Sequence, residues 1–344
     1  MRCITEEDIN KMSKDKSKKY ISNIYLELWC NKDLGGDICK VWHNGKQSDN
    51  SYMFCNDKIG KAIKEQDEKQ QLEILTNVFQ IKNEEFADIF HDACFGKGKE
   101  YKEILRLHSS ALCPLLFFND LEKHPMELSL DNKKVLFNKA IFEYENKVFD
   151  PRYPSNVDVV LISEDRKTVL FLESKFSEYF KTSCDPIKFS YLTKTHFYDD
   201  SFLNKLGLRI IKENDSPKRF IDKKKNEGFK LETIYAEEKC YLDGIKQMIS
   251  HYIGVQNFIS KPAIDKRLEY QGQEIYLGEI IFDFSFDEAK TKFENYSKVY
   301  QKLAENLNSE NKDIKVLSEP LKYSMFKTNG YELNSKIKNF YFGK

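Results

Sequence analysis

The chain has 344 residues, and its 55 lysines and arginines are balanced by 55 acidic residues. Without a whole-chain basic excess, composition does not favour nucleic acid as a partner, although a local basic patch would be enough to bind it. No apolar segment reaches the length of a membrane span, which excludes a transmembrane helix. The first residues, MRCITEEDIN, contain no apolar core of a signal peptide, and we expect a cytoplasmic protein.

The eight cysteines are scattered, and none stands in a CxxC pair. We therefore expect reduced thiols rather than a disulfide framework. Cys30, Cys39, His43 and Cys55 are residue types that can bind zinc, but their spacing fits no compact zinc motif. Small buried thiols are the favoured interpretation of this group.

The first hundred residues are predicted to be mainly helical. Helices are expected over residues 57–81, 83–94 and 107–118. Asn83 is a candidate cap of the second helix. Ser109 or Ser110 is a candidate cap of the third, where Pro114 must lie in the first turn or cause a kink.

The middle of the chain is rich in Val, Ile, Leu and Phe, which favours strands. Three successive strands are predicted over residues 133–148, 156–163 and 167–176. After a polar and aromatic stretch, we expect a helix at 238–255, a strand at 274–284, a helix at 286–307 and a strand at 313–318. This order is an α/β pattern with a mixed sheet.

The second and third predicted strands form a hairpin around a polar loop. Folding it symmetrically gives three facing pairs: Ile162 with Val169, Val160 with Phe171, and Asp158 with Glu173. Lys175 follows two residues after Glu173, on the same face. Because directly facing Cβ atoms lie about 4.5–5.5 Å apart, this register predicts two carboxylates beside a lysine.

Two carboxylates that face each other destabilise a sheet unless a positive charge offsets their repulsion. Mg²⁺ prefers oxygen ligands and would provide that charge. A metal ion beside a lysine suits phosphodiester hydrolysis, since the ion polarises the phosphate and the lysine orients the attacking water. The alternative is an ion-pair cluster at a solvent-exposed strand end. Both strands are apolar on both faces, so they should be covered, and an unneeded charge cluster there would be costly.

Asp158 together with Glu173-Ser174-Lys175 resembles the signature of the PD-(D/E)XK nucleases, the restriction-endonuclease-like superfamily. The segments SNVDVVL and VLFLESKFSEY are similar to an N-(I/L)-D…ESKF(T/S)E block of a bacterial family within it. The flanking segments LHSSALCPLLFF and YLDGIKQMISHYIG also resemble that family, so the resemblance covers residues from about 107 to 285. Val157 stands where the superfamily signature has proline.

The resemblance implies a restriction-endonuclease-like α/β domain over residues 107–344, with a mixed four- to five-stranded sheet flanked by helices. A mainly helical region over residues 1–106 would precede it. The resemblance also implies Mg²⁺, with Mn²⁺ as a candidate substitute, held by Asp158, Glu173 and the backbone carbonyl of Ser174. Lys175 would be catalytic, DNA the partner, and a homodimer one candidate assembly.

Gln247 and His251 lie four residues apart, hence on one helix face. Related nucleases use a glutamine on this helix to contact the substrate or the lysine, which makes Gln247 a candidate catalytic residue. The alternative, a polar helix face packed under a loop, is equally open for Gln247 and favoured for His251. Glu143 is a weak candidate for a further acidic ligand, and a solvent-facing strand residue is the favoured interpretation.

Residues 108–110 and 216–230 contain side chains that could act in catalysis or binding, but a structural role is favoured for both groups. His108, Ser109 and Ser110 are better explained by a helix cap than by a nucleophile with its base, because no nucleophile elbow surrounds them. Residues 216–230 are rich in lysine and are predicted to form a solvated helix or loop. In a nuclease, this basic run becomes a candidate phosphate-contacting surface.

The sequence thus predicts a Mg²⁺-dependent deoxyribonuclease, of restriction type, in bacterial defence or DNA processing. One alternative is a non-catalytic nucleic-acid- or protein-binding module that kept the fold, against which intact Asp158, Glu173 and Lys175 argue. The other is a metal-dependent phosphoesterase, which would have a deep pocket for a smaller substrate. Strand preference and the choice between endonuclease and exonuclease action stay open.

Overall fold

A computed structural model describes most of the chain. It covers residues 23–25, 27–28, 38–43, 46–54, 67–96, 104–107, 109–149, 155–181, 184–222, 225–235, 239–261, 267–268, 271–327 and 330–343, with 38–43 and 46–54 described by their backbone alone. Cys30, Cys55 and His108 lie outside the described residues, as do the side chains of Cys39 and His43. The cysteines whose side chains are described are buried and form no disulfide: Cys94, Cys113, Cys184 and Cys240.

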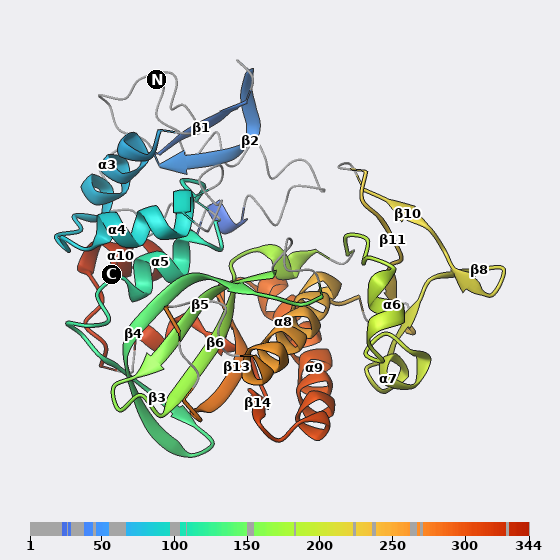
Figure 1. Ribbon diagram of the computed structural model, residues 1–344. Helices are drawn as coiled ribbons and strands as arrows, with labels where there is room; N and C mark the ends of the chain where they lie inside the picture. The colour runs from blue at the N-terminus through green and yellow to red at the C-terminus, as the bar shows by residue number, and fades with distance from the viewer. Residues whose placement is uncertain are drawn as a thin grey trace.

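The centre of the fold is one mixed sheet (Figure 1) with the strand order β14-β13-β6-β5-β4-β3, in which β15 also pairs with β13. Its strands are β3 (Met126–Leu130), β4 (Lys133–Asn146), β5 (Ser155–Ser163), β6 (Thr168–Lys175), β13 (Glu274–Ile281), β14 (Ile314–Val316) and β15 (Leu321–Lys322). Strands β3 to β6 pair antiparallel, whereas β13 is parallel to β6. The expected mixed α/β sheet is confirmed, and the short strands β3 and β15 make it wider than the predicted four to five strands.

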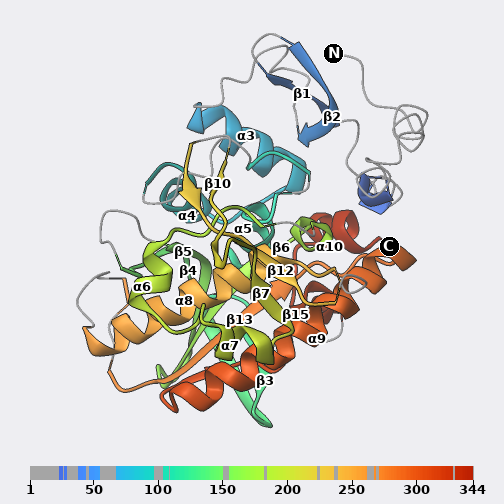
Figure 2. The same ribbon diagram turned by 90° about the vertical axis from the view of Figure 1, so that its right-hand side faces the viewer.

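Helices cover both faces of this sheet (Figures 1 and 2). On one face lie α8 (Leu242–Ser260) and α9 (Asp287–Glu310); on the other are α3 (Glu68–Phe79), α4 (Phe86–His91), the π-turn η2 (Asp92–Gly96), α5 (Leu112–Phe118), the 3₁₀ turn η5 (Tyr323–Lys327) and α10 (Ser335–Phe342). Alternate residues of β6 reach the two layers. The Phe171 ring packs against Phe258 of α8, with 5.9 Å between ring centroids, while Ser174 Oγ donates to the Ser110 carbonyl before α5.

The strands and helices predicted from residue 133 onward are confirmed, with ends that move by a few residues. The helix predicted over residues 57–81 corresponds, in its described part, to α3. The helix predicted over residues 83–94 corresponds to α4 followed by η2. The expectation of a mainly helical N-terminal region is wrong in one respect, because β1 (Ile38–His43) and β2 (Lys46–Phe54) form an antiparallel hairpin. No described helix has both the length and the apolar character needed to span a bilayer.

Two predicted helix starts have the expected chemistry. Ser109 Oγ accepts a hydrogen bond from Leu112 N at 3.2 Å, and Pro114 lies in the first turn of α5, where its missing N–H leaves no bond unmade. Asn83 lies two residues before the cap position of α4, and its side chain accepts a bond from Glu85 N at 3.2 Å. The cap positions themselves are Glu85 for α4 and Ala111 for α5, so both predicted caps lie two residues too early, although each side chain accepts a bond from a backbone N–H at the start of its helix.

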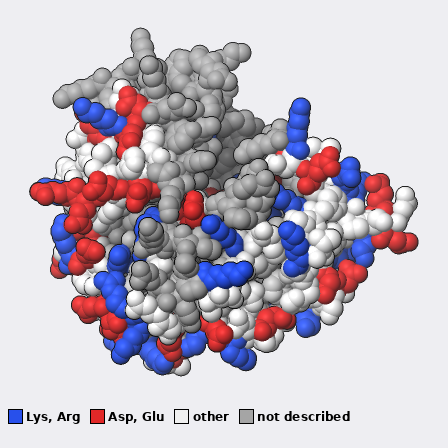
Figure 3. All heavy atoms as spheres, in the orientation of Figure 1, with Lys and Arg blue, Asp and Glu red and all other residues white. Residues whose placement is uncertain are grey.

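The stretch between β6 and α8 forms a projection beside the sheet (Figure 1). It contains the 3₁₀ turn η4 (Glu178–Phe180), α6 (Ser190–Lys194), α7 (Asp200–Lys205), β7 (Leu208–Ile210), β8 (Lys212–Glu213), β9 (Ser216–Pro217), β10 (Phe220–Ile221), β11 (Glu227–Gly228) and β12 (Leu231–Thr233). The basic run 216–230 was predicted to be a solvated helix or loop, but its described residues contain β9, which pairs with β8, and the hairpin of β10 with β11. Lys223 and Lys224 lie outside the described residues. Acidic neighbours offset part of the charge of the run. Lys218 pairs with Glu213 at 3.4 Å, and Arg219 pairs with Glu227 at 3.4 Å. Both signs of charge alternate on the face drawn in Figure 3.

We predict that Gly254→Ala destabilises the fold, because α8 approaches β4 most closely at this glycine. A Cβ there would collide with the side chain of Asn146, whose amide donates to the His251 carbonyl at 2.9 Å. The collision should outweigh the better helix propensity of alanine and lower the free energy of unfolding by about 1–3 kcal/mol in urea denaturation.

Two further variants test the cause of this effect. Ser260→Ala, at the exposed end of the same helix, should unfold like the wild type. Adding Asn146→Ala to Gly254→Ala should recover part of the loss by removing the colliding atoms. A Gly254→Ala protein as stable as the wild type would contradict the close packing of α8 on β4.

Candidate functional site

The predicted register of the β5–β6 hairpin is correct. Val160 pairs with Phe171 and Ile162 with Val169, and the ladder ends at the pair that precedes Asp158 and Glu173. Beyond that pair, Ser174 N donates to Asp158 Oδ2 at 2.6 Å. The Asp158 carboxylate therefore occupies the open end of the hairpin and accepts a backbone donor there.

Four acidic residues occupy one level across four adjacent strands of the sheet. They are Glu143 on β4, Asp158 on β5, Glu173 on β6 and Glu279 on β13, and we call them the acidic row. Glu279 is the register partner of Glu173, and the pairs on both sides of the Glu143–Asp158 level are in register. Burial raises the pKa values of Asp158 and Glu279, and repulsion from Glu173 adds to the effect at both residues, so the row brings mutually repelling carboxyl groups together inside the fold.

The Glu173 carboxylate is the best-connected member of the row. Its Oε1 accepts from Lys175 Nζ at 2.7 Å and from Gln247 Nε2 at 2.9 Å, while its Oε2 lies 2.9 Å from His251 Nε2. Burial alone would raise the pKa of Glu173, but the adjacent Lys175 ammonium and the contact with His251 outweigh burial and lower the pKa to about 2. Glu173 is therefore ionised at neutral pH.

Lys175 is enclosed together with Glu173. Their residue exposures are 3% and 4%, so the sequence-based alternative of an ion pair at a solvent-exposed strand end is wrong. Burial acts to lower the pKa of Lys175, yet the negative charge of Glu173, followed by Tyr241 and Asp158, raises that pKa well above its usual value. The ammonium stays charged, and its bond to Glu173 uses one of its three N–H donors.

Asp158 keeps contact with solvent, unlike Glu173 and Lys175, because the residue is only half-buried. Protein atoms still surround its carboxylate, and this burial, followed by repulsion from Glu173, raises its pKa well above the ordinary range. Among the described residues, Asp158 Oδ1 accepts no hydrogen bond. A second positive charge beside Asp158 and Glu173 would relieve the repulsion that raises the pKa of Asp158.

Glu143 is buried, so its interpretation as a solvent-facing strand residue is wrong. Its φ of 49° lies in the left-handed region, which interrupts the alternation of β4 and turns the residue inward. The guanidinium of Arg267 donates to the carbonyls of Phe142 and Glu143 at 3.0 and 3.2 Å, and Asn156 Nδ2 donates to Glu143 Oε2 at 3.2 Å. These contacts hold a strained conformation beside Asp158.

The helix α8 supplies two residues to Glu173, one turn apart. Gln247 contacts Glu173 directly and accepts from Tyr241 OH at 3.4 Å. The interpretation of His251 as part of a polar face under a loop is wrong, because its ring is buried between Glu173 and Ser155, whose Oγ lies 3.4 Å from Nδ1. The i, i+4 spacing in the sequence was the signal that both residues reach one group.

Glu279 was not identified from the sequence. Tyr296 OH donates to its Oε2 at 2.7 Å, while its fully buried Oε1 has no hydrogen-bond partner in the part of the chain that the structure describes. Burial raises the pKa of Glu279 to about 7, although Lys175 acts in the opposite direction. A detectable signal was present, because the segment YLGEIIFDF places one glutamate inside an apolar strand, as LFLESKF does for Glu173.

Ser174 is completely buried and anchors the hairpin end to the other helical layer. Its Oγ donates to the Ser110 carbonyl at 2.8 Å and lies 2.9 Å from Tyr323 OH. The next turn of chain is fixed by Glu178, whose Oε2 accepts from Phe176 N at 2.8 Å and Ser177 N at 2.9 Å. The strand end that carries Glu173 and Lys175 is therefore held from both faces.

The donor set fits a magnesium ion that keeps much of its water. Among the described residues, Asp158 Oδ1 accepts no hydrogen bond, and three contacts use three of the about four acceptor positions of the Glu173 carboxylate, which leaves one on Oε2. Within the described part of the chain, no three His, Cys, Asp or Glu side chains converge as a metal site. Mg²⁺ is commonly held by one or two carboxylates together with waters and substrate phosphates, so two carboxylates are sufficient.

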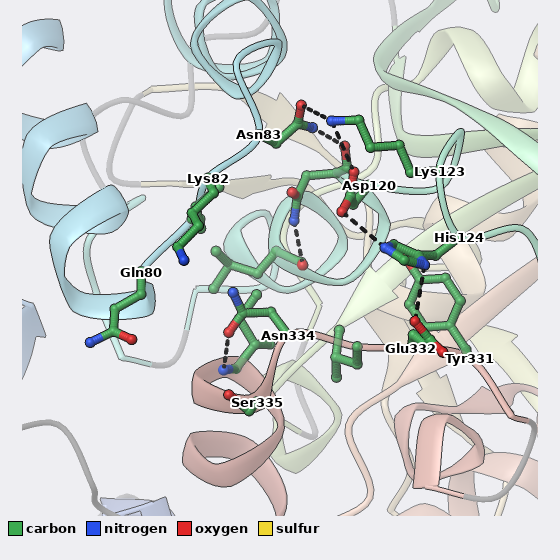
Figure 4. Close-up of a pocket in the computed structure, with 15 residues that line it drawn as sticks. Gln80, Lys82, Asn83, Asp120, Lys123, His124, Tyr331, Glu332, Asn334 and Ser335 are labelled. Carbon is green, nitrogen blue, oxygen red and sulfur yellow. Dashed lines mark hydrogen bonds and ion pairs between the residues drawn. The ribbon is translucent and has the colours of Figure 1, made fainter.

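A pocket of about 430 Å³ lies where the α3–α4 loop, the end of α5 and the start of α10 meet (Figure 4). Its polar groups are engaged with one another: Lys123 Nζ donates to Asn83 Oδ1 at 3.2 Å, and His124 Nδ1 lies 3.3 Å from Glu332. These contacts connect segments that are distant in the sequence. No member of the acidic row lines this pocket, and we interpret it as part of the packing between helices.

Comparison with models of protein families, with curated proteins and with solved structures finds no match to this chain. The predicted resemblance to PD-(D/E)XK nucleases is therefore carried by residues of this chain alone: Asp158, Glu173, Ser174 and Lys175.

We predict that Glu279→Gln makes the protein more stable than the wild type at alkaline pH. The folded-state pKa of Glu279 is raised from 4.5 to about 7, so its contribution to stability is present below about pH 4.5 and is lost as the pH rises through 7. The loss is on the order of 3 kcal/mol, and glutamine cannot ionise. Thermal unfolding between pH 5 and 8.5 should show a smaller decline for the variant.

The exposed Glu164 in the β5–β6 loop provides the control. Glu164→Gln should follow the wild-type pH profile. If Glu279→Gln also follows it, then Glu279 is not the buried ionisable group that the geometry indicates.

Proposed function

We propose that the chain is a Mg²⁺-dependent deoxyribonuclease with a restriction-endonuclease-like core. The observation that carries the proposal is the meeting of Asp158, Glu173 and Lys175 at the open end of the β5–β6 hairpin, with Gln247 on the same carboxylate. Strands β4, β5, β6 and β13, with α8 packed on them, provide a four-stranded mixed core of the kind that the resemblance implies.

Asp158 and Glu173 would hold the ion, and the Ser174 carbonyl is the third proposed ligand. When bound there, Mg²⁺ supplies polarisation of the scissile phosphate and a lower pKa for a bound water. The two N–H donors of Lys175 that Glu173 does not use would orient the attacking water and offset charge that develops on the phosphate. Gln247 positions Glu173 from α8, and its amide fixes which carboxylate oxygen faces Lys175.

Burial of the cluster is consistent with this role and also favours one alternative. A dry, hydrogen-bonded pair such as Lys175–Glu173 can serve only to specify the packing of a sheet, in a binding module that performs no chemistry. That alternative does not account for the open Asp158 oxygen or for the repulsion that raises the pKa of Asp158. We therefore favour the nuclease.

Two variants of the Lys175–Glu173 pair distinguish a nuclease from a binding module that performs no chemistry. Lys175→Met keeps the length of the side chain and removes its charge. We predict that Mg²⁺-dependent cleavage of plasmid and linear DNA falls by about 10²–10³-fold, because one preorganised charge is lost. The free energy of unfolding should also fall, by roughly 3–5 kcal/mol, because a buried carboxylate loses its partner.

The double variant Lys175→Met/Glu173→Gln removes both charges at similar volume and should recover most of the stability without any cleavage. The exposed Lys302→Gln on α9 is the control for a lost surface charge and should cleave normally. Wild-type protein with EDTA should be inactive. Cleavage by the double variant at the wild-type rate would end the proposal, and so would wild-type protein that cleaves no DNA with Mg²⁺ or Mn²⁺.

A further inference from the structure

A pocket of about 400 Å³ lies beside the acidic row, between the chain that follows β4, the start of β5, the segment around α6, and α8. Helix α6 lies beside α8 in both ribbon views (Figures 1 and 2), and Tyr191 OH is 2.8 Å from Ser250 Oγ across their contact. The volume is within the range of small-ligand sites. The pocket is therefore large enough for one nucleotide, whereas stacked duplex DNA is too wide to enter it.

The charge of the pocket suits a phosphate. Lys188, Lys194 and Lys246 line it, and among the described residues that line it none is acidic. Lys246 is paired with Asp243 at 2.8 Å on the α8 side, and the Lys194 ammonium lies 5.6 Å from the centre of the Phe149 ring. Lysine and arginine side chains that neutralise phosphates provide a large share of the affinity of proteins for the nucleic-acid backbone.

Its aromatic wall suits a base. Phe149 and Tyr191 meet edge to face, with ring centroids 5.0 Å apart and planes at 70°, and both rings are only half-buried. Half-buried rings next to lysines are the usual platform for an unstacked base, because every base has a π face and the neighbouring phosphate meets the positive charge. Within a duplex, the same base would be covered by its neighbours.

Hydrogen bonds connect the pocket wall to the acidic row. Ser155 lines the pocket, and its Oγ lies 3.4 Å from His251 Nδ1, while Nε2 of the same ring is 2.9 Å from Glu173 Oε2. Ser250, the residue before His251, also lines the pocket. A nucleotide in this position would thus lie two hydrogen bonds from the carboxylate that we assign to the metal.

We propose that this pocket binds one unstacked nucleotide of single-stranded DNA, with its base against Phe149 and Tyr191 and its phosphate near Lys194. The inference rests on the proposed nuclease function and assigns its substrate class. The substrate would be a single strand, or a duplex end that has opened. The cleaved phosphodiester would lie next to the bound nucleotide. Intact duplex would bind more weakly because a base must first leave the stack.

The test measures binding in EDTA, where no cleavage takes place, by fluorescence anisotropy with a labelled single-stranded oligonucleotide and the matching duplex. The single strand should bind at least about tenfold more tightly than the duplex. Tyr191→Leu, which removes the ring, should weaken single-strand binding roughly tenfold, whereas Tyr191→Phe, which keeps the ring and loses only the bond to Ser250, should bind like the wild type. Lys194→Gln should lower the slope of affinity against salt by about one ion.

A second measurement does not depend on the folding of any variant. An oligonucleotide with photoreactive 5-iododeoxyuridine, irradiated with wild-type protein, should crosslink to Phe149 or Tyr191. Crosslinks that map only elsewhere would overturn the inference, and so would unchanged single-strand binding by Tyr191→Leu.

The two proposals fail in different ways. If Tyr191→Leu and Lys194→Gln bind normally while wild-type protein cleaves DNA with Mg²⁺, the pocket is not the nucleotide site and the nuclease proposal stands. If Tyr191→Leu loses single-strand binding and Tyr191→Phe keeps it, but wild-type protein cleaves nothing, the pocket is a single-strand binding site and the nuclease proposal is wrong.

Discussion

The structure depends on how one carboxylate, Glu173, is accommodated inside a sheet. An isolated charge at this position would be very costly, and the fold avoids that cost by bringing three donors to it: Lys175 from the same strand and Gln247 and His251 from α8. These bonds fix the rotation of α8 about its axis. They also require the close contact of Gly254 with β4, because the helix must lie low on the sheet for its side chains to reach Glu173.

The burial of carboxyl groups at one level of the sheet also accounts for the strain around the acidic row. Three further carboxylates lie at the level of Glu173, where Lys175 is the adjacent ammonium. Burial, with repulsion from Glu173 in addition, raises the pKa values of Asp158 and Glu279. Glu143 lies in an unusual backbone conformation, and its carbonyl accepts from Arg267. Asp158 lies at the solvent side with one open oxygen. A fold under selection for stability alone would gain by replacing such a row with apolar residues, so we infer that its charge is used.

Much of this arrangement is predictable from the amino-acid sequence because it depends on local periodicity. The polar loop 164–167 sets the hairpin register, and that register alone places Asp158 and Glu173 at one level. The order of the later strands and helices follows from the same patterns. The i, i+4 spacing also places Gln247 and His251 on one face of a helix.

The rest depends on contacts between segments that are far apart in the sequence. His251 reaches Glu173 only because α8 crosses β6 at a particular depth, and periodicity cannot give that depth. Glu279 joins the row because β13 pairs parallel to β6, a register that no loop between them fixes. The inward turn of Glu143 comes from a positive φ that a glutamate rarely adopts. The pocket beside Ser155 forms only because the segment around α6 packs against α8, and no local sequence pattern predicts that contact.

If Asp158 and Glu173 together hold a divalent cation, a crystal of the protein soaked in Mn²⁺ should show one anomalous peak at about 2.0–2.2 Å from Asp158 Oδ1 and from an oxygen of Glu173, with the Lys175 ammonium still beside it. A well-ordered site with no peak at saturating Mn²⁺, and with the Lys175–Glu173 bond unchanged, would show that the cluster is an ion pair that only holds the sheet together.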